Sequence, residues 1–285
     1  MGCGSWTTSS FRSYATTKGY NTTADGSISG SYSNQEMFKS KNLDPALNPK
    51  NVIRECCDTE EHPNTIPVIL ALDVTGSMND VSVEIAKKLN IIMTKLYKDI
   101  VDVEFMIMGI GDLAYDSAPI QISQFESDIR IAEQLDKLWF ENGGGGNAYE
   151  SYTAAWYMGS RHTKVDCNKR NKKGIIITIG DERLNPYLPK DQLNYITGDI
   201  NQGNIETKEL YQEVNKKFNI YHLDVNHRRH FDADNIKMSF IEYLDENHFK
   251  VVNLNNIVDE IIDIITNEIM QNTGTLISEN GEITW

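Results

Sequence analysis

Residues 66–78 read IPVILALDVTGSM, an apolar run that ends in the carboxylate of Asp73 and turns through Gly76. The apolar run has the length and composition of a buried strand, and a helical pattern begins near Val81. Ligands of open α/β sheets bind at the carboxyl ends of strands, where Asp73, Thr75 and Ser77 would lie. Their all-oxygen set suits a hard divalent cation such as Mg²⁺.

Strand-like and helix-like patterns alternate along most of the chain. Strands are predicted at 66–73, 101–110, 118–124, 174–180, 219–225 and 248–253, and helices at 80–98, 127–139, 148–161, 205–218, 236–245 and 255–270. This alternation predicts a doubly wound, Rossmann-like α/β fold, with a mostly parallel central sheet flanked by helices. A long irregular insertion is predicted at 185–204, at the same end of the sheet as Asp73.

The two ends of the chain differ from this pattern. Residues 1–64 are predicted to form a polar N-terminal arm and connector, residues 65–270 a domain, and residues 271–285 a tail with a hairpin signal at Asn280-Gly281. The aromatic residues of 1–34 show no helical period, and this segment is too polar to fold on a core of its own. We therefore expect an extended arm that is either disordered or ordered against this domain or a neighbouring subunit.

The formal net charge of -14 argues against a nucleic-acid partner. No apolar run approaches the roughly 20 residues that span a bilayer, and the chain does not begin with the charged-then-apolar order of a signal peptide. The four cysteines lack the spacing of zinc or redox sites, so we expect free thiols in a reducing compartment. These features predict a cytoplasmic protein with no membrane partner.

A second carboxylate, Asp181, follows the predicted strand at 174–180, and Asp112 follows the strand at 101–110. Asp73 and Asp181 would meet at one edge of the sheet, where two close carboxylates repel unless they are protonated or bridged by a cation. The alternative is that both residues cap nearby helices, while Thr75 and Ser77 bond to the backbone. The ordered set as a whole favours metal binding.

Together, the motif Asp73-x-Thr75-x-Ser77, the glycine-rich loop and the later Asp181 resemble the von Willebrand factor type A (vWA) domain over roughly residues 65–270. The resemblance implies a metal-ion-dependent adhesion site (MIDAS). In such a site, hydroxyls and carboxylates hold Mg²⁺, with Mn²⁺ or Ca²⁺ as alternatives. One coordination position stays open for the carboxylate of a protein partner.

The family usually supplies a threonine from a second loop, where this chain has Gly146-Asn147-Ala148-Tyr149-Glu150-Ser151. The resemblance therefore assigns the third ligand to Asn147, with Ser151 and Thr153 as alternatives. The predicted partner-binding rim consists of Asp112, Glu150, Ser151 and Met78.

Three functions follow from these patterns. The first is a non-enzymatic, Mg²⁺-dependent interaction module that binds an acidic side chain of a partner protein. The second is a metal-dependent hydrolase or phosphatase, in which Asp181 or Asp112 acts as the base. The third is a structural subunit of an assembly, because the aromatic N-terminal arm, the tail hairpin and the missing export signal suit a chain that forms oligomers through this arm. The segments MGCGSW, 43–47 and 73–78 also resemble proteins encoded by large bacteriophages, and that resemblance implies a virion or infected-cell context but no activity.

Two weaker patterns predict no site. The residues His222, His227 and His230 with Asp224 fit no standard zinc spacing. The glycine run at 143–146 lacks the Lys-Ser/Thr ending of a phosphate-binding loop, so we expect a flexible backbone beside the metal site.

Overall fold

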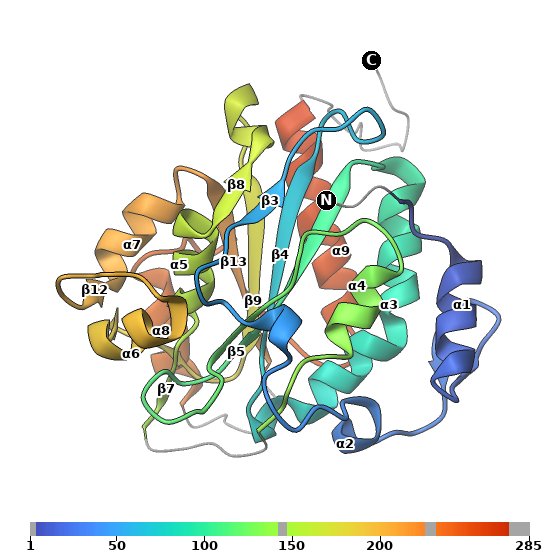
Figure 1. Cartoon of the computed structure of the whole chain (residues 1–285), viewed down its shortest axis with the longest axis horizontal. Helices are drawn as coiled ribbons and strands as arrows, with labels where there is room; N and C mark the ends of the chain where they lie inside the picture. The colour runs from blue at the N-terminus through green and yellow to red at the C-terminus, as the bar shows by residue number, and fades with distance from the viewer. Residues whose placement is uncertain (1–3, 142–146, 226–231, 274–285) are drawn as a thin grey trace.

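A six-stranded sheet runs through the centre of the protein (Figure 1). The structure, a computed structural model, describes residues 4–141, 147–225 and 232–273. The strands lie in the order β14-β13-β9-β4-β5-β6, and all neighbours are parallel except β5 and β6. Their bounds are β4 (Ile66–Asp73), β5 (Val103–Ile110), β6 (Ile120–Ile122), β9 (Gly174–Gly180), β13 (Phe218–Val225) and β14 (Phe249–Val252). The prediction of a mostly parallel α/β sheet is confirmed.

Helices cover both faces of this sheet (Figure 1). One face carries α3 (Asn79–Asp99), α4 (Arg130–Leu135) and α9 (Ile257–Thr273). The opposite face carries α5 (Thr153–Arg161), α6 (Lys190–Thr197), α7 (Thr207–Val214) and α8 (Ala233–Ile241). A strand buried on both sides needs apolar residues at every position, which explains the unbroken apolar run of β4.

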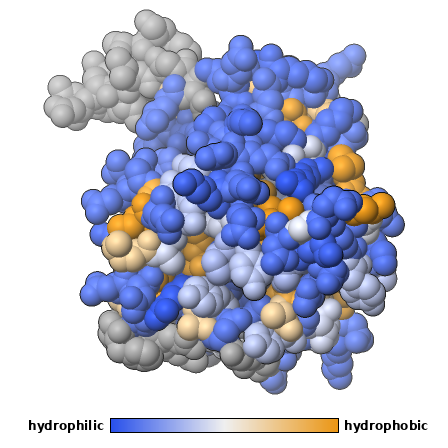
Figure 2. All heavy atoms as spheres, turned by 90° about the vertical axis from the view of Figure 1, so that its left-hand side faces the viewer, coloured by the Kyte–Doolittle hydropathy of each residue, from blue (hydrophilic) through white to orange (hydrophobic). Residues whose placement is uncertain are grey.

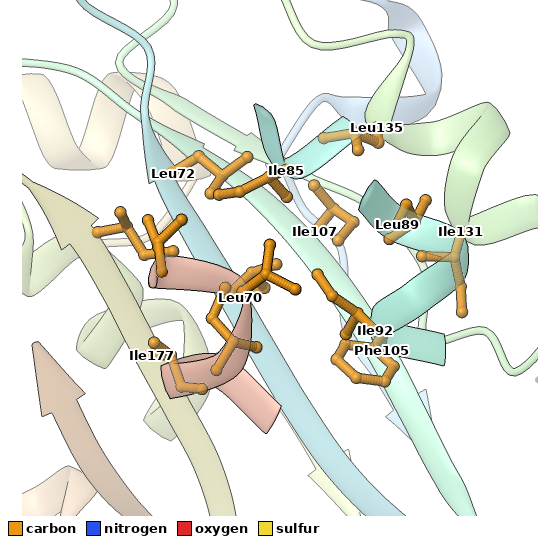
Figure 3. Packing of buried hydrophobic residues seen from close by; sticks show 14 of the residues in the cluster. Leu70, Leu72, Ile85, Leu89, Ile92, Phe105, Ile107, Ile131, Leu135 and Ile177 are labelled. Carbon is orange, nitrogen blue, oxygen red and sulfur yellow. The ribbon is translucent and has the colours of Figure 1, made fainter. Parts of the chain in front are cut away.

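Side chains of β4 alternate between the two cores. Leu70 and Leu72 point toward α3, where Ile85, Leu89 and Ile92 recur at helical spacing (Figure 3). Ile69 and Ala71 point to the other face and pack in the core that contains Trp156 of α5. Burying a side chain such as Leu or Ile contributes roughly 1.5–3 kcal/mol. The two cores therefore fix β4, and with it the position of Asp73.

Several boundaries differ from the sequence prediction because of short pairings between distant segments. The helix predicted from residue 148 begins at Thr153, since β7 (Tyr149–Glu150) pairs with β10 (Arg183–Leu184). The connector contains η1 (Pro45–Leu47) and β3 (Arg54–Cys56), which pairs with β8 (Thr163–Val165); η3 (Asp166–Arg170) follows β8. The insertion predicted to be irregular contains β11 (Tyr187–Leu188) and α6, and β11 pairs with β12 (Ile205–Glu206). The tail at 274–285, with its predicted hairpin, lies outside the described residues.

The N-terminal segment is ordered against this domain, one of the alternatives that the sequence left open, but it is folded and not extended. It contains α1 (Thr8–Thr17), β1 (Asn21–Thr22), β2 (Ile28–Ser29) and α2 (Asn34–Met37). The Thr7 hydroxyl caps α1 by accepting the Ser10 N–H at 3.1 Å. Phe11 and Ala15, four residues apart, are buried in the core shared with α3. Packing against the same chain therefore stabilises a helix that has no strong pattern of its own.

A buried asparagine on α3 forms hydrogen bonds with the N-terminal segment. Asn90 Oδ1 accepts the indole N–H of Trp6, and its Nδ2 donates to the carbonyl of Asp25, both at 3.0 Å. The neighbouring Gly26 has φ +86°, and a Cβ there would lie 2.3 Å from Asn90 Nδ2. Both ends of the Asn90 amide are thus used to hold the N-terminal segment.

The face over α6, α7 and α8 is mainly hydrophilic, with scattered hydrophobic side chains (Figure 2). Ile200 and Met238 are among the exposed apolar residues of the chain. Within the described ranges, no helix is long and apolar enough to cross a bilayer. Cys56, Cys57 and Cys167 are free thiols, as expected.

Removing the Trp6 side chain tests the docking of the N-terminal segment. The Trp6 side chain is 6% exposed, and its ring centroid lies 5.5 Å from that of Phe11. Trp6→Ala should therefore lower the free energy of unfolding by roughly 3–5 kcal/mol. Urea denaturation measures the change. The control is Tyr115→Ala, at a side chain that is 59% exposed, which should stay within about 0.5 kcal/mol of the wild type. Equal free energies of unfolding for the two variants would contradict the packing of the N-terminal segment against the domain.

Candidate metal centre

Two carboxylates come together at the carboxyl end of the sheet. β4 ends at Asp73, and β9 ends at Gly180, directly before Asp181. The two strands pair in parallel with Leu72 opposite Ile179, so the residues that follow leave the sheet at the same edge. The turn after Asp73 passes through η2 (Gly76–Met78) into α3, which brings Ser77 back toward Asp181.

A chain of hydrogen bonds joins the four motif residues. Asp73 Oδ1 accepts the backbone N–H of Thr75 at 2.8 Å and its hydroxyl at 2.6 Å. The Ser77 hydroxyl donates to Asp181 Oδ1 at 2.9 Å, and Thr75 Oγ1 lies 3.3 Å from Ser77 Oγ. A hydroxyl that gives its proton to a carboxylate presents lone pairs in its other directions, as a metal ligand must. The structure thus brings Asp73, Thr75, Ser77 and Asp181 into one cluster.

The electrostatics of this cluster favour a cation. Asp73 is fully buried, and burial together with the charge of Asp181 raises its pKa to about 7, although Thr75 and Tyr152 donate hydrogen bonds to it. Burial, followed by the charge of Asp73, also raises the pKa of Glu150 well above its usual value. Asp181 Oδ2 is buried and accepts no hydrogen bond from the residues that the structure describes. A bound cation would offset these carboxylate charges.

The predicted third ligand lies in a different network. Asn147 Nδ2 donates to Asp112 Oδ2 at 2.7 Å, while its Oδ1 accepts the N–H of Tyr149 at 2.8 Å. The two alternatives are also engaged elsewhere. Ser151 Oγ accepts the N–H of Leu113 at 3.0 Å, and Thr153 Oγ1 accepts Nδ2 of Asn185 at 2.6 Å. No hydrogen bond between described residues joins any of the three to Asp73 or Asp181.

The predicted rim is mostly interior. Met78 is 1% exposed because η2 turns its side chain into the core that contains Leu72 and Ile85. Glu150 and Ser151 are also buried, whereas Asp112 is partly exposed. Met78, Glu150 and Ser151 are therefore not at the surface, where a partner-binding rim would have to lie. Sequence alone does not show which way a side chain turns after a strand ends.

Two further residues belong to the cluster. The hydroxyl of Tyr152 donates to Asp73 Oδ2 at 3.0 Å and accepts the N–H of Glu182 at 3.3 Å. Asp224 is the second-last residue of β13, and burial plus the charge of Asp181 raises its pKa to about 7. The carboxyl-end rule that identified Asp73 could also have identified Asp224, which lies near the end of a predicted strand. No sequence signal marked Tyr152.

Tyr152 also explains the glycine before Asp181. A Cβ at Gly180 would lie 1.8 Å from the Tyr152 hydroxyl oxygen, a distance that no real contact allows. Glycine therefore lets the backbone of β9 approach the phenol ring.

The donor set fits a hard cation and not zinc. Across the described ranges, no group of three or more His, Cys, Asp or Glu side chains could hold a metal ion. A cation at the cluster would therefore depend on the hydroxyls of Thr75 and Ser77, which are ligands for Mg²⁺ rather than zinc. His222 is buried, its pKa is lowered to about 3 by burial, and it stacks on Phe240. His227, His230 and the glycine run lie outside the described residues.

No family model and no curated protein matches the chain. Among solved structures, it is similar to the open conformation of the pilus adhesin SpaC from Lactobacillus rhamnosus GG, with a TM-score of 0.49 and 11% identity over 78% of this chain. It is also similar to the vWF domain of the type V pili tip protein Mfa5 from Porphyromonas gingivalis, with a TM-score of 0.45 and 13% identity over 77% of this chain. The chain spans 31% of the length of SpaC and 98% of that of the Mfa5 domain.

The raised pKa of Asp73 predicts a pH dependence of stability without metal. Its pKa is about 7 when folded against a usual value of 3.8, so the folded state binds the extra proton between these values. The contribution of Asp73 to the free energy of unfolding is therefore greatest below pH 3.8. It falls as the pH rises toward 7, by up to about 1.4 kcal/mol per pH unit. Urea denaturation at pH 5 and pH 7 measures the fall.

Asp73→Asn isolates this contribution, because it keeps the shape of the side chain and removes the titration. The loss of unfolding free energy between pH 5 and pH 7 should be smaller in the variant than in the wild type by about 1 kcal/mol or more. Identical losses in the two proteins would show that Asp73 does not titrate in this range.

The close contact at Gly180 gives a second test. Gly180→Ala should lower the free energy of unfolding by about 1–3 kcal/mol, because the new methyl group overlaps the Tyr152 side chain. The matched control is Gly203→Ala, where a Cβ would meet nothing within 4 Å. Thermal or urea unfolding compares the two, and a tolerated alanine at 180 would contradict the packing of Tyr152.

Proposed function

We propose that this protein is a doubly wound vWA-type module that binds a partner protein through a divalent cation. The proposed ligands are Asp73, Thr75, Ser77 and Asp181, and the proposed cation is Mg²⁺. One observation carries the proposal: two buried carboxylates bracket two hydroxyls in a single hydrogen-bonded cluster at the carboxyl end of the sheet. Helix capping does not account for the two carboxylates, because the N-cap positions of η2 and α3 are Thr75 and Met78 and not Asp73 or Asp181.

The residues have distinct roles in this proposal. Asp73 and Asp181 supply negative charge from neighbouring strands, and their backbone is fixed by the sheet. Thr75 and Ser77 supply neutral oxygens from the turn between β4 and α3, and each gives its proton to one of the carboxylates. The cation itself would supply an open coordination position for an oxygen of the partner.

The charge of the chain favours a cation-mediated contact. With a formal net charge of -14, the protein repels an acidic partner at long range. The candidate site adds to this repulsion, since Asp73, Asp181, Glu150 and Asp224 all lie in or beside it. A divalent cation reverses the local sign and makes a partner carboxylate a ligand. We therefore propose a binding role, and no catalytic one, for this site.

Calorimetric titration with Mg²⁺ and Mn²⁺ tests the proposal. The wild type should bind with a saturable isotherm, and Asp73→Ala should abolish it by removing the central carboxylate. Saturating metal should also raise the melting temperature of the wild type, because a ligand that binds only the folded state stabilises it.

The control is Asp259→Asn, which removes an exposed carboxylate paired with Lys95 on α3, far along the chain from the motif. It should bind metal like the wild type. The proposal is wrong if the wild type shows no binding at millimolar metal, or if Asp73→Ala binds as the wild type does.

A further inference from the structure

The loop after β7 contributes a tyrosine to the candidate site. Three smaller polar side chains near it have partners in other networks: Asn147 before β7, Ser151 after it, and Thr153 at the start of α5. Tyr152, the residue before α5, has a fully buried side chain, and its hydroxyl reaches Asp73. Among residues 147–153, the phenol hydroxyl of Tyr152 is the side-chain group that forms a hydrogen bond with the metal motif.

The hydrogen-bond roles of this hydroxyl are fixed. The backbone N–H of Glu182 can only donate, so Tyr152 accepts from it and gives its own proton to Asp73 Oδ2. The other oxygen, Asp73 Oδ1, accepts both hydrogen bonds from Thr75. Three donors therefore hold the Asp73 carboxylate, two from Thr75 on Oδ1 and one from Tyr152 on Oδ2.

The ring of Tyr152 has little freedom to move. It packs against His222 at 5.0 Å and Phe240 at 5.8 Å between ring centroids. On another side it meets the backbone of β9, which comes so close that only glycine fits at 180. The hydroxyl is therefore held in place by the core, and it ties the turn after β4 to the loop after β9.

We propose that Tyr152 is a positioning residue that holds Asp73 in a one-oxygen binding mode and so makes the site selective for Mg²⁺ over Ca²⁺. This inference rests on the proposed function. Mg²⁺ requires a small, regular set of oxygens, whereas Ca²⁺ accepts more ligands in a looser arrangement, including carboxylates that bind through both oxygens. A carboxylate whose second oxygen is held by Tyr152 serves the smaller ion better.

The experiment compares Tyr152→Phe with Tyr157→Phe by calorimetric titration of the full chain with Mg²⁺ and with Ca²⁺. Tyr157 is the matched control, because it is buried, lies on α5, which begins directly after Tyr152, and donates to the carboxylate of Asp199 at 2.5 Å, outside the candidate site. Each variant loses one tyrosine–aspartate hydrogen bond and keeps the ring.

For Tyr152→Phe, we expect the Mg²⁺ affinity to fall at least tenfold, as for other groups that orient metal ligands, while the Ca²⁺ affinity falls less. The preference for Mg²⁺ over Ca²⁺ should therefore shrink several-fold. Tyr157→Phe should leave both affinities within about twofold of the wild type, since its partner is not a proposed ligand. Gly180→Ala, which forces the hydroxyl aside without removing it, should change the preference in the same direction.

The outcomes separate this inference from the proposed function. Unchanged Mg²⁺ binding in Tyr152→Phe, or equal losses for the two cations, would overturn the positioning role and leave the metal site standing. A wild type that binds neither cation would overturn both. Circular dichroism of each variant shows whether the fold is retained at the temperature of the titration.

Discussion

The repulsion between two buried carboxylates is the constraint around which this end of the molecule is built. Parallel pairing of β4 with β9 places Asp73 and Asp181 at one edge of the sheet, and both side chains are buried there. Neighbouring side chains donate hydrogen bonds to both carboxylates: Thr75 and Tyr152 donate to Asp73, and Ser77 donates to Asp181. These donors reduce the repulsion without removing it, since the pKa of Asp73 remains raised.

Much of the fold follows from local sequence, and the rest depends on contacts between distant segments. β4 and β9 have the predicted bounds, because unbroken apolar runs flanked by polar turns leave little ambiguity about a strand buried on both faces. The start of α5 was predicted five residues too early, since β7 depends on pairing with β10, about 34 residues further along. The helix at Thr8–Thr17 could not be predicted for a related reason: its apolar side chains are ordered by α3.

The candidate site divides in the same way. Motif spacing and strand ends can be read from the sequence, and they identified Asp73, Thr75, Ser77 and Asp181. The structure joins these residues in one chain of hydrogen bonds, from Asp73 through Thr75 and Ser77 to Asp181. The direction of a side chain is not visible in this way. Met78 turns inward, Asn147 bonds to Asp112, and Tyr152 reaches a partner 79 positions earlier in the chain. The metal and its partner remain proposals that rest on the donor set.

The close fit between Gly180 and Tyr152 has a consequence for how this protein can evolve. A side chain at 180 is incompatible with the phenol ring, whereas a smaller residue at 152 leaves a cavity that a side chain at 180 could fill. The two positions are therefore epistatic: a side chain at 180 destabilises the protein less once the side chain at 152 has become smaller. Descendants of this sequence that keep the tyrosine should keep the glycine, and a lineage that loses the tyrosine releases position 180 to drift.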